Sequence, residues 1–348
     1  MTEDRTSEVT SFGDACYWSG VTDSDRPAWL ERRRSLLTAS ETAAVLGEDT
    51  RSSAFKVYWD KVQPGESLEF GIESPAFWGR ILEGPILTAV ADYYGWEHRR
   101  GGALLISRKY PWLGATLDYE IDRGLGHKEP FEGKTTAFML RGDWNELTGD
   151  MPNRVVLQVQ HQLLVTQAES AAVFCLVGGQ GACLIDVEPE PELHTIIVEE
   201  SERFLDMVKR RLEPPPGPND TSTLDRIYPD RGNGIVKLGK AEVEWAREVM
   251  QLSEEIKLRT SRKKSLLNAI KRSIGNATWG RLPEPVGGAS WMKWYQGKDS
   301  VRLLKNGPLV TGELPTALPV ALNELPAPET DFTQITRAAL KKRRKARR

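Results

Sequence analysis

The segment PFEGKTTAF, residues 130–138, places a carboxylate and an ammonium group two positions apart, at Glu132 and Lys134. Pro130 opens the segment, and its aromatic and threonine residues favour a strand over a helix. On a strand, residues i and i+2 point to the same face. We therefore expect one acid and one base side by side on a short strand.

A second carboxylate, Asp118, lies fourteen residues before Glu132 in the strand-like segment 113–122. The intervening RGLGHKEP supplies turn residues, so the two segments are predicted to form an antiparallel hairpin. Phosphodiester cleavage needs a divalent cation to generate hydroxide and to neutralise developing charge. Mg²⁺ prefers carboxylate oxygens, and a neighbouring ammonium group stabilises negative charge in the transition state. The pattern therefore indicates a metal-dependent phosphodiesterase site.

The Glu-x-Lys spacing is weak evidence when it stands alone. Glu255 and Lys257 show the same spacing inside a charged, helix-like segment without an upstream strand aspartate. A surface ion pair of that kind contributes little. The strand setting and Asp118 are what distinguish the pair at residues 132 and 134.

The remaining pattern alternates helices and strands. A capping box at Thr38 and Glu41 predicts a helix ending near Gly47. Further helices are predicted over 76–95, 153–167 and 194–212, and strands over 102–107, 113–122, 130–138, 170–179 and 182–189. This order predicts an α/β or α+β fold.

The chain is expected to divide into five parts. We predict a flexible leader at 1–24, a core at 25–212, a linker at 213–240, a helical arm with a β-ribbon at 241–310, and a disordered Pro/Ala-rich segment with a basic tail at 311–348. The arm is predicted as one long helix or a helical hairpin over 241–274. The ribbon is predicted as two strands over 289–305, turning near Gly297.

The composition is that of an ordinary soluble protein and argues against a membrane or secreted one. The 348 residues are 39% hydrophobic, and the apolar runs are too short for a membrane span. The N-terminus lacks the layout of a secretion signal, and three cysteines without a CxxC indicate a reduced, cytoplasmic protein. The net charge of −2 hides an acidic body and a basic C-terminus, RAALKKRRKARR. Such a tail indicates either an anionic partner or a solubilising segment.

Other kinds of site find less support. The four histidines show no zinc-ligand spacing, and the glycines of VGGQGA lack the lysine of a phosphate loop. Trp291, Trp294 and Tyr295, interleaved with Lys293 and Lys298, could stack on bases or pack within their own domain.

Taken in order, the candidate residues resemble the lambda exonuclease and YqaJ-type viral recombinase family, within the restriction-endonuclease-like nuclease superfamily. Trp29, Arg33 and TASE at 38–41 resemble the family's N-terminal segment, and the linker from Pro214 resembles that of relatives. The matches to the family's helix glutamate, its D…ExK core and its QVQ segment are Glu83, Asp118, Glu132, Lys134 and Gln158. The similarity covers roughly residues 26–230 and is looser to about residue 305.

The resemblance implies a restriction-endonuclease-like core in which a central mixed sheet is flanked by helices. It implies that Mg²⁺, with Mn²⁺ as a substitute, is bound by Asp118, Glu132, the carbonyl of Gly133 and Glu83. Lys134 would hold the attacking water or the phosphate, and Gln158, one helical turn from Gln162, would support the site. Two departures are Gly133, where relatives usually carry a large apolar residue, and Leu117, where proline is common.

The resemblance further implies that Arg33, Thr38 and Ser40 anchor a terminal 5′-phosphate. This agrees with the affinity of helix N-termini for phosphate, although Thr38 and Ser40 could equally serve as helix caps.

The expected function is therefore a 5′-to-3′ exonuclease acting on linear double-stranded DNA in phage-type recombination. The expected partners are a single-strand annealing protein and further copies of this chain, which would form a homo-oligomer such as a trimer. An endonuclease or repair nuclease of the same superfamily and a non-cleaving DNA-binding protein are the alternatives.

Overall fold

The computed structural model describes residues 9–63, 71–229, 232, 234–294, 301–304, 306 and 308. The chain divides into two compact units, Met1–Gly232 and Asn233–Arg348. No helix in the described part of the chain is long and apolar enough to span a membrane.

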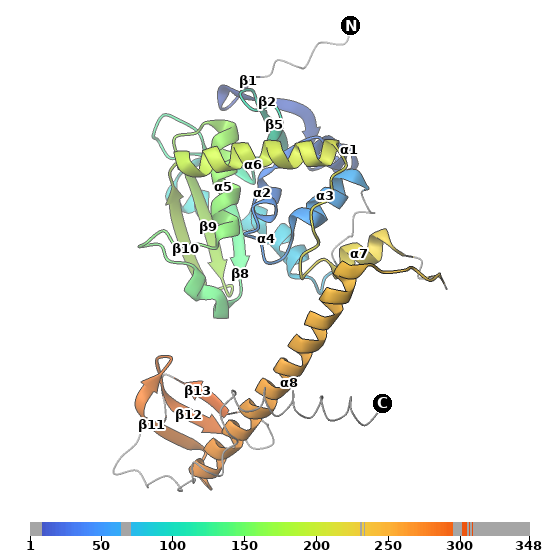
Figure 1. Ribbon diagram of the computed structural model, residues 1–348. Coiled ribbons are helices and arrows are strands. Elements are labelled where there is room, and N and C mark those ends of the chain that lie inside the picture. Colours follow the sequence, from blue (N-terminus) through green and yellow to red (C-terminus); the bar gives the residue numbers. More distant parts are fainter. Residues whose placement is uncertain are drawn as a thin grey trace. The chain divides into compact units, whose positions relative to one another are not determined.

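The first unit contains both strands and helices (Figure 1). Its strands are β1 (Val9–Thr10), β2 (Gly13–Thr22), β3 (Leu37–Thr38), β4 (Glu97–Arg100), β5 (Ala103–Ser107), β6 (Leu113–Thr116), β7 (Tyr119–Asp122), β8 (Glu129–Thr136), β9 (Ala171–Val177) and β10 (Gly181–Val187). Its helices are α1 (Arg26–Arg33), α2 (Ala39–Val45), α3 (Ala54–Val62), α4 (Pro75–Tyr94), α5 (Asn153–Thr166), α6 (Pro191–Lys209), α7 (Thr221–Ile227) and the 3₁₀ helix η2 (Phe138–Asp143).

The strands form two mixed sheets rather than one central sheet. The first has the order β1-β2-β5-β6-β3, and the second has the order β10-β9-β8-β7-β4. The predicted hairpin is present, because β7 pairs antiparallel with β8 and Tyr119 lies opposite Phe131. β8 then pairs in parallel with β9. The predicted α/β class, with mixed sheets flanked by helices, is confirmed.

Helix α5 lies at the centre of the first unit. Its Val155, Val159 and Leu163 are fully buried and pack against β9 and β10, while Leu164 and Val165 belong to a second apolar cluster with α2, α3 and α6. α4 packs in a third cluster with β7, β8 and β9. Because strand side chains alternate between faces, β8 is held on both sides, with α4 contacting one face and α5 the other.

The ends of the helices follow the sequence signals. α4 begins after Ser74, which caps Ala76, and it ends at Gly95, which has a φ of 70°. α2 begins at Thr38, and Gly47 lies just past its end with a φ of 77°. Glycine accepts this left-handed conformation without the steric cost of a Cβ atom. The helices predicted over 76–95, 153–167 and 194–212 are confirmed as α4, α5 and α6.

Two segment predictions are wrong in part. The expected leader at 1–24 includes β2, which pairs with β5 and buries Cys16, so its second half belongs to the core. The expected linker at 213–240 includes α7, and the carboxylate of Asp220 accepts hydrogen bonds from Ser53 at the start of α3. In both segments, long-range pairing overrides a composition typical of loops.

The described residues of the second unit form α8 (Lys240–Ile274) and a three-stranded antiparallel sheet of β11 (Trp279–Val286), β12 (Ala289–Trp294) and β13 (Val301–Leu304) (Figure 1). The arm is thus one helix and not a hairpin. β12 and β13 form the expected ribbon, and β11 is a strand that the sequence reading missed. Gly297 and residues 311–348 lie outside the described residues.

Candidate active site

Asp118 lies where the chain leaves one sheet and enters the other. β6 of the first sheet ends at Thr116, and β7 of the second begins at Tyr119, so Asp118 sits in a break between strands. Its Oδ2 atom accepts a hydrogen bond of 2.9 Å from the backbone N–H of Gly133. The aspartate is thereby fixed against the Glu-x-Lys segment.

Glu132 is the most enclosed of the predicted site residues, with only 1% of its surface exposed. Its Oε1 atom accepts hydrogen bonds from the ammonium group of Lys134 and from Nε2 of Gln158, the latter at 2.6 Å. Its Oε2 atom accepts a 2.6 Å hydrogen bond from Nε2 of Gln162. Gln158 and Gln162 lie one turn apart on α5, so this helix supports the carboxylate from the face opposite α4.

The carboxyl groups of the site repel one another. Burial, followed by the charge of Glu132, raises the pKa of Glu83 to about 7. The same two causes raise the pKa of Asp118 well above its ordinary value. Burial alone lowers the pKa of Lys134, but Glu132 and Asp118 outweigh it, so this pKa lies above its ordinary value. Three carboxyl groups around one ammonium group would carry an uncompensated negative charge if all were ionised, and this repulsion adds to the effect of burial on the pKa values of Glu83 and Asp118.

Gly133 lets α4 approach the site strand. A Cβ atom built at Gly133 would lie 3.1 Å from the side chain of Leu87, which is completely buried. Burying a leucine of this kind contributes about 1.5–3 kcal/mol. Leu87 therefore fills the space that a side chain at position 133 would otherwise occupy.

The predicted metal ligands are close enough to interact electrostatically, but they do not form a closed cluster. Among the residues with a described placement, no group of three His, Cys, Asp or Glu side chains is arranged to hold a metal ion. The donor set nevertheless suits Mg²⁺, because it consists of carboxylate oxygens with an excess of negative charge. The residues fit a divalent cation in chemistry, and the assignment of Asp118, Glu132, Glu83 and the Gly133 carbonyl as ligands stays a prediction.

The second predicted group, Arg33, Thr38 and Ser40, is brought together across two helices. Nη2 of Arg33 donates to Oγ1 of Thr38 at 2.6 Å and to Oγ of Ser40 at 2.8 Å. The guanidinium lies 4.1 Å from the centre of the Trp29 ring, a cation–π contact that holds its plane. Burial lowers the pKa of Arg33, against the opposing charge of Glu41.

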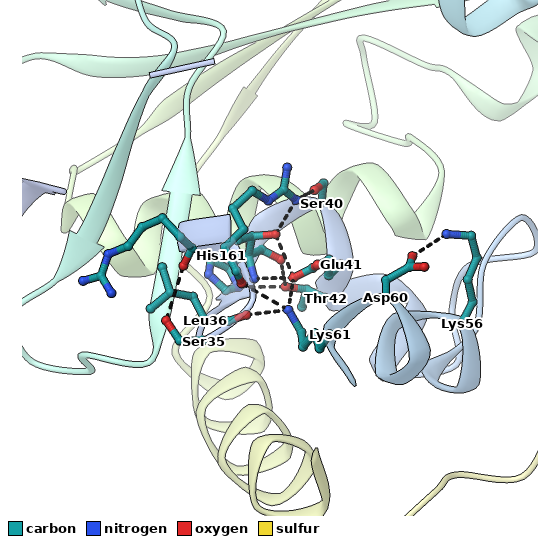
Figure 2. A network of polar contacts seen from close by, with 12 residues as sticks. Ser35, Leu36, Ser40, Glu41, Thr42, Lys56, Asp60, Lys61 and His161 are labelled. Carbon is teal, nitrogen blue, oxygen red and sulfur yellow. Dashed lines mark hydrogen bonds and ion pairs between the residues drawn. The ribbon is translucent and has the colours of Figure 1, made fainter. Parts of the chain in front are cut away.

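An ion pair beneath this group fixes the start of α2 (Figure 2). The Glu41 carboxylate accepts hydrogen bonds from the backbone N–H of Thr38 at 2.9 Å and from its hydroxyl group at 2.8 Å. Lys61 of α3 donates to the same carboxylate at 3.0 Å and to the carbonyl oxygen of Leu36 at 2.6 Å. Burial raises the pKa of Glu41, but the charges of Lys61 and Arg33 outweigh it, and the net shift is downward.

Two contacts connect the arginine group to the acidic site. Nε1 of Trp29 donates to Oγ1 of Thr116 at 3.1 Å, two residues before Asp118. Nδ1 of His161, on α5, lies 2.7 Å from Oγ1 of Thr42 on α2 (Figure 2). The helix that positions Gln158 and Gln162 is thus joined to the helix that begins at Thr38.

Residues 28–169 match the model of the YqaJ-like viral recombinase domain. This segment is similar to YqaJ-like viral recombinase domains. The chain is also 26% identical, over 261 residues, to the uncharacterized protein YqaJ of Bacillus subtilis (strain 168), covering 73% of this chain and 80% of that protein.

Solved structures give a weaker likeness. An alkaline exonuclease from Laribacter hongkongensis aligns at 15% identity with a TM-score of 0.40, and its complex with dAMP aligns at 16% with a TM-score of 0.42. Each alignment covers 58% of this chain and 98% of the other. Both TM-scores are low, and no assignment for this chain rests on them. The family match and the constellation of Asp118, Glu132 and Lys134 support a nuclease of the lambda exonuclease type.

Two residues that shape the YqaJ-like domain were missed in the sequence. Lys61 follows Val57 and Tyr58 on the buried face of α3, and a lysine at helical spacing on an apolar face is the signal that could have found it. Gly101 lies directly beneath the Asp118 segment, because a Cβ atom there would stand 2.1 Å from the carbonyl oxygen of Leu117. No local pattern in the sequence indicates that close approach.

Proposed function

We propose that this protein is a Mg²⁺-dependent deoxyribonuclease that degrades one strand of linear double-stranded DNA from its 5′ end. The observation that carries the proposal is the meeting of Asp118, Glu132 and Lys134 at the junction of two sheets, with an excess of carboxylates. The YqaJ-like domain supports the same class of reaction.

In this proposal, Asp118, Glu132, Glu83 and the carbonyl of Gly133 hold the cation. Bound Mg²⁺, or Mn²⁺ in its place, supplies a water of lowered pKa and neutralises charge on the phosphate. Lys134 places a positive charge beside the attacking water or the scissile phosphate, which stabilises the transition state. Gln158 and Gln162 keep the Glu132 carboxylate oriented by donating one hydrogen bond to each of its oxygen atoms.

Arg33, Thr38 and Ser40 bind the terminal 5′-phosphate in the same proposal. The guanidinium already lies between the two hydroxyl groups, and the N-terminal N–H groups of α2 favour an anion. Digestion from an end then follows from geometry, because the anchor requires a free 5′ terminus.

The test uses linear duplexes with a 5′-phosphate or a 5′-hydroxyl group and a closed circular duplex of the same sequence. Each is incubated with the full chain in Mg²⁺, Mn²⁺ or EDTA, and the products are resolved with time. We expect the 5′-phosphorylated linear duplex to be shortened in Mg²⁺, the closed circle to remain intact, and EDTA to stop the reaction. Cutting of the circle would instead identify an endonuclease or repair nuclease. Metal-independent binding without products would identify a non-cleaving DNA-binding protein.

The proposal extends to recombination in a virus or prophage, in the cytoplasm of a bacterial host. The recombinase name of the matched domain and the relative in a bacterium support this setting. Degradation of one strand exposes the other, and a single-strand annealing protein would take up that product. Co-purification of the full chain with a single-strand annealing protein from the same genome tests the partnership. Failure of the two proteins to co-purify would argue against it.

A homo-oligomer, specifically a ring-shaped trimer, completes the proposal, because a ring around DNA would give processive digestion without ATP. Light scattering on the eluting full-length protein measures the mass directly. A monomeric mass together with processive digestion would contradict the ring.

The basic residues of 337–348 lie outside the described residues and are proposed to contact phosphate groups. Removing them should weaken DNA binding mainly at low salt and reduce the dependence of log affinity on log salt. An unchanged slope would assign the tail another role.

A further inference from the structure

One face of the sheet in the second unit carries an alternating set of aromatic and basic side chains. In one row of paired residues, Trp279 lies opposite Lys293, which lies opposite Arg302. In the other row, Arg281 lies opposite Trp291, and Trp291 lies opposite Leu304. Directly paired residues share a face, and so do residues two apart on a strand. These two rows together are called the tryptophan face.

The tryptophan face points away from α8. The residues between its rows, Gly280, Met292 and Leu303, belong to the opposite face of the sheet. A Cβ atom at Gly280 would stand 3.1 Å from Ile274 of α8, which places the helix on that opposite side. Helix packing therefore does not account for the composition of the tryptophan face.

The two tryptophan rings are held by cations and lie at right angles. Nζ of Lys293 lies 4.8 Å from the centre of the Trp279 ring, and Cζ of Arg281 lies 5.8 Å from that of Trp291. The two ring centres are 6.4 Å apart with an interplanar angle of 89°. Arg281 and Arg302 are exposed, and the other four side chains of the tryptophan face are half-buried.

We propose that the tryptophan face binds single-stranded DNA. Arg281, Lys293 and Arg302 bring positive charge to this face, which attracts a phosphate backbone, and its indole rings offer surfaces on which bases stack. A flexible single strand can turn successive bases against each ring, whereas the bases of a duplex are stacked on one another and are not available to the rings. The site lies wholly within the second unit and does not depend on the proposed nuclease activity.

The experiment measures binding of a fluorescein-labelled oligothymidylate to the full chain by anisotropy, in EDTA so that no cleavage intervenes. Trp291→Leu keeps an apolar side chain but removes the aromatic surface, and we expect it to weaken binding about tenfold. Trp245→Leu is the matched control, because Trp245 is a 61% exposed tryptophan of α8 away from the sheet, and its affinity should not change. Trp291→Phe should retain most of the affinity.

Arg281→Gln provides an independent test, because Arg281 is exposed and its replacement should not disturb packing as that of the half-buried Trp291 could. It should reduce the slope of log affinity against log salt by about 0.7, the value for one contact with a single strand. Wild-type binding in both Trp291→Leu and Arg281→Gln would overturn the proposal, as would an equal loss in Trp245→Leu. If Trp291→Leu loses its folded circular-dichroism spectrum, Arg281→Gln decides. The same variants should cleave a duplex in Mg²⁺ at an unchanged initial rate. Loss of single-strand binding therefore tests this proposal, and duplex cleavage tests the proposed nuclease function separately.

Discussion

The acidic site and the arginine network each contain an ion pair between glutamate and lysine, but they carry opposite excess charge. Around Lys134 there are three carboxyl groups, and the pKa of Asp118 is raised. Around Glu41 there are two cations, Arg33 and Lys61, and its pKa is lowered. Burial acts to raise the pKa of both carboxyl groups. The charge of Glu132 adds to this rise at Asp118, whereas the charges of Lys61 and Arg33 outweigh it at Glu41. This difference agrees with the proposed roles of the first region in binding a cation and of the second in binding a phosphate group.

The largest expected effect comes from removing the carboxylate of the second region. Glu41→Ala leaves the Lys61 ammonium buried without its partner, and we expect a loss of about 3–5 kcal/mol in the free energy of unfolding. Urea denaturation measures it. Glu31→Ala, which breaks the exposed Glu31–Arg34 pair, is the matched control and should cost less than about 1 kcal/mol. Equal losses in the two variants would mean that the buried Glu41–Lys61 pair contributes no more to stability than the exposed pair.

Removing the ammonium group of the first region should act on catalysis instead. Lys134→Ala is expected to lower the cleavage rate by about 10²–10³-fold while DNA binding in EDTA is retained. Glu132→Ala should likewise abolish cleavage, because it removes a predicted ligand. Lys257→Ala is the control, since Glu255 and Lys257 have the same spacing on the exposed helix α8. Full activity of Lys134→Ala would remove the basis for the active-site assignment.

His161, which joins the two regions, should make stability depend on pH. Burial lowers its pKa to about 4 in the folded state, against 6.5 for an exposed histidine. The unfolded chain therefore binds the proton first as pH falls, and stability present above pH 6.5 is lost progressively towards pH 4, by about 3 kcal/mol in total. Urea titrations at pH 7.5, 6 and 5 measure the slope. His161→Gln should flatten this slope, and an unchanged slope would assign it to other groups.

The smallest expected effect tests the anion preference of the arginine network. Arg33→Lys keeps the charge but loses the planar fork, so the preference for a 5′-phosphate over a 5′-hydroxyl terminus should fall about tenfold. Competition between the two linear duplexes measures it. Arg32→Lys, at an exposed neighbouring arginine, should leave the preference unchanged. If both variants discriminate like the original chain, the terminus is bound elsewhere.

Several features of this protein could be predicted from short stretches of its sequence. The strand setting of Glu132 and Lys134, the hairpin that brings Asp118 beside them, and the glutamine spacing on α5 all follow from periodicities of 2 and 3.6 residues. The start of α2 at Thr38 follows from the capping pattern. These depend on contacts between residues near one another in the chain.

Other features required contacts across the fold. The burial of Lys61 beneath Glu41, the approach of Gly101 to Leu117, and the pairing of β2 with β5 each join distant segments, so no local pattern specifies them. Strand β11 of the second unit was not predicted for the same reason. Pro283 and Pro285 argue against a strand in the local sequence, and only its pairing with β12 defines it. Sequence thus determined which chemical groups are available on which element. Tertiary packing decided which charges face each other, because burial and distance, not residue type, set the strength of an electrostatic interaction.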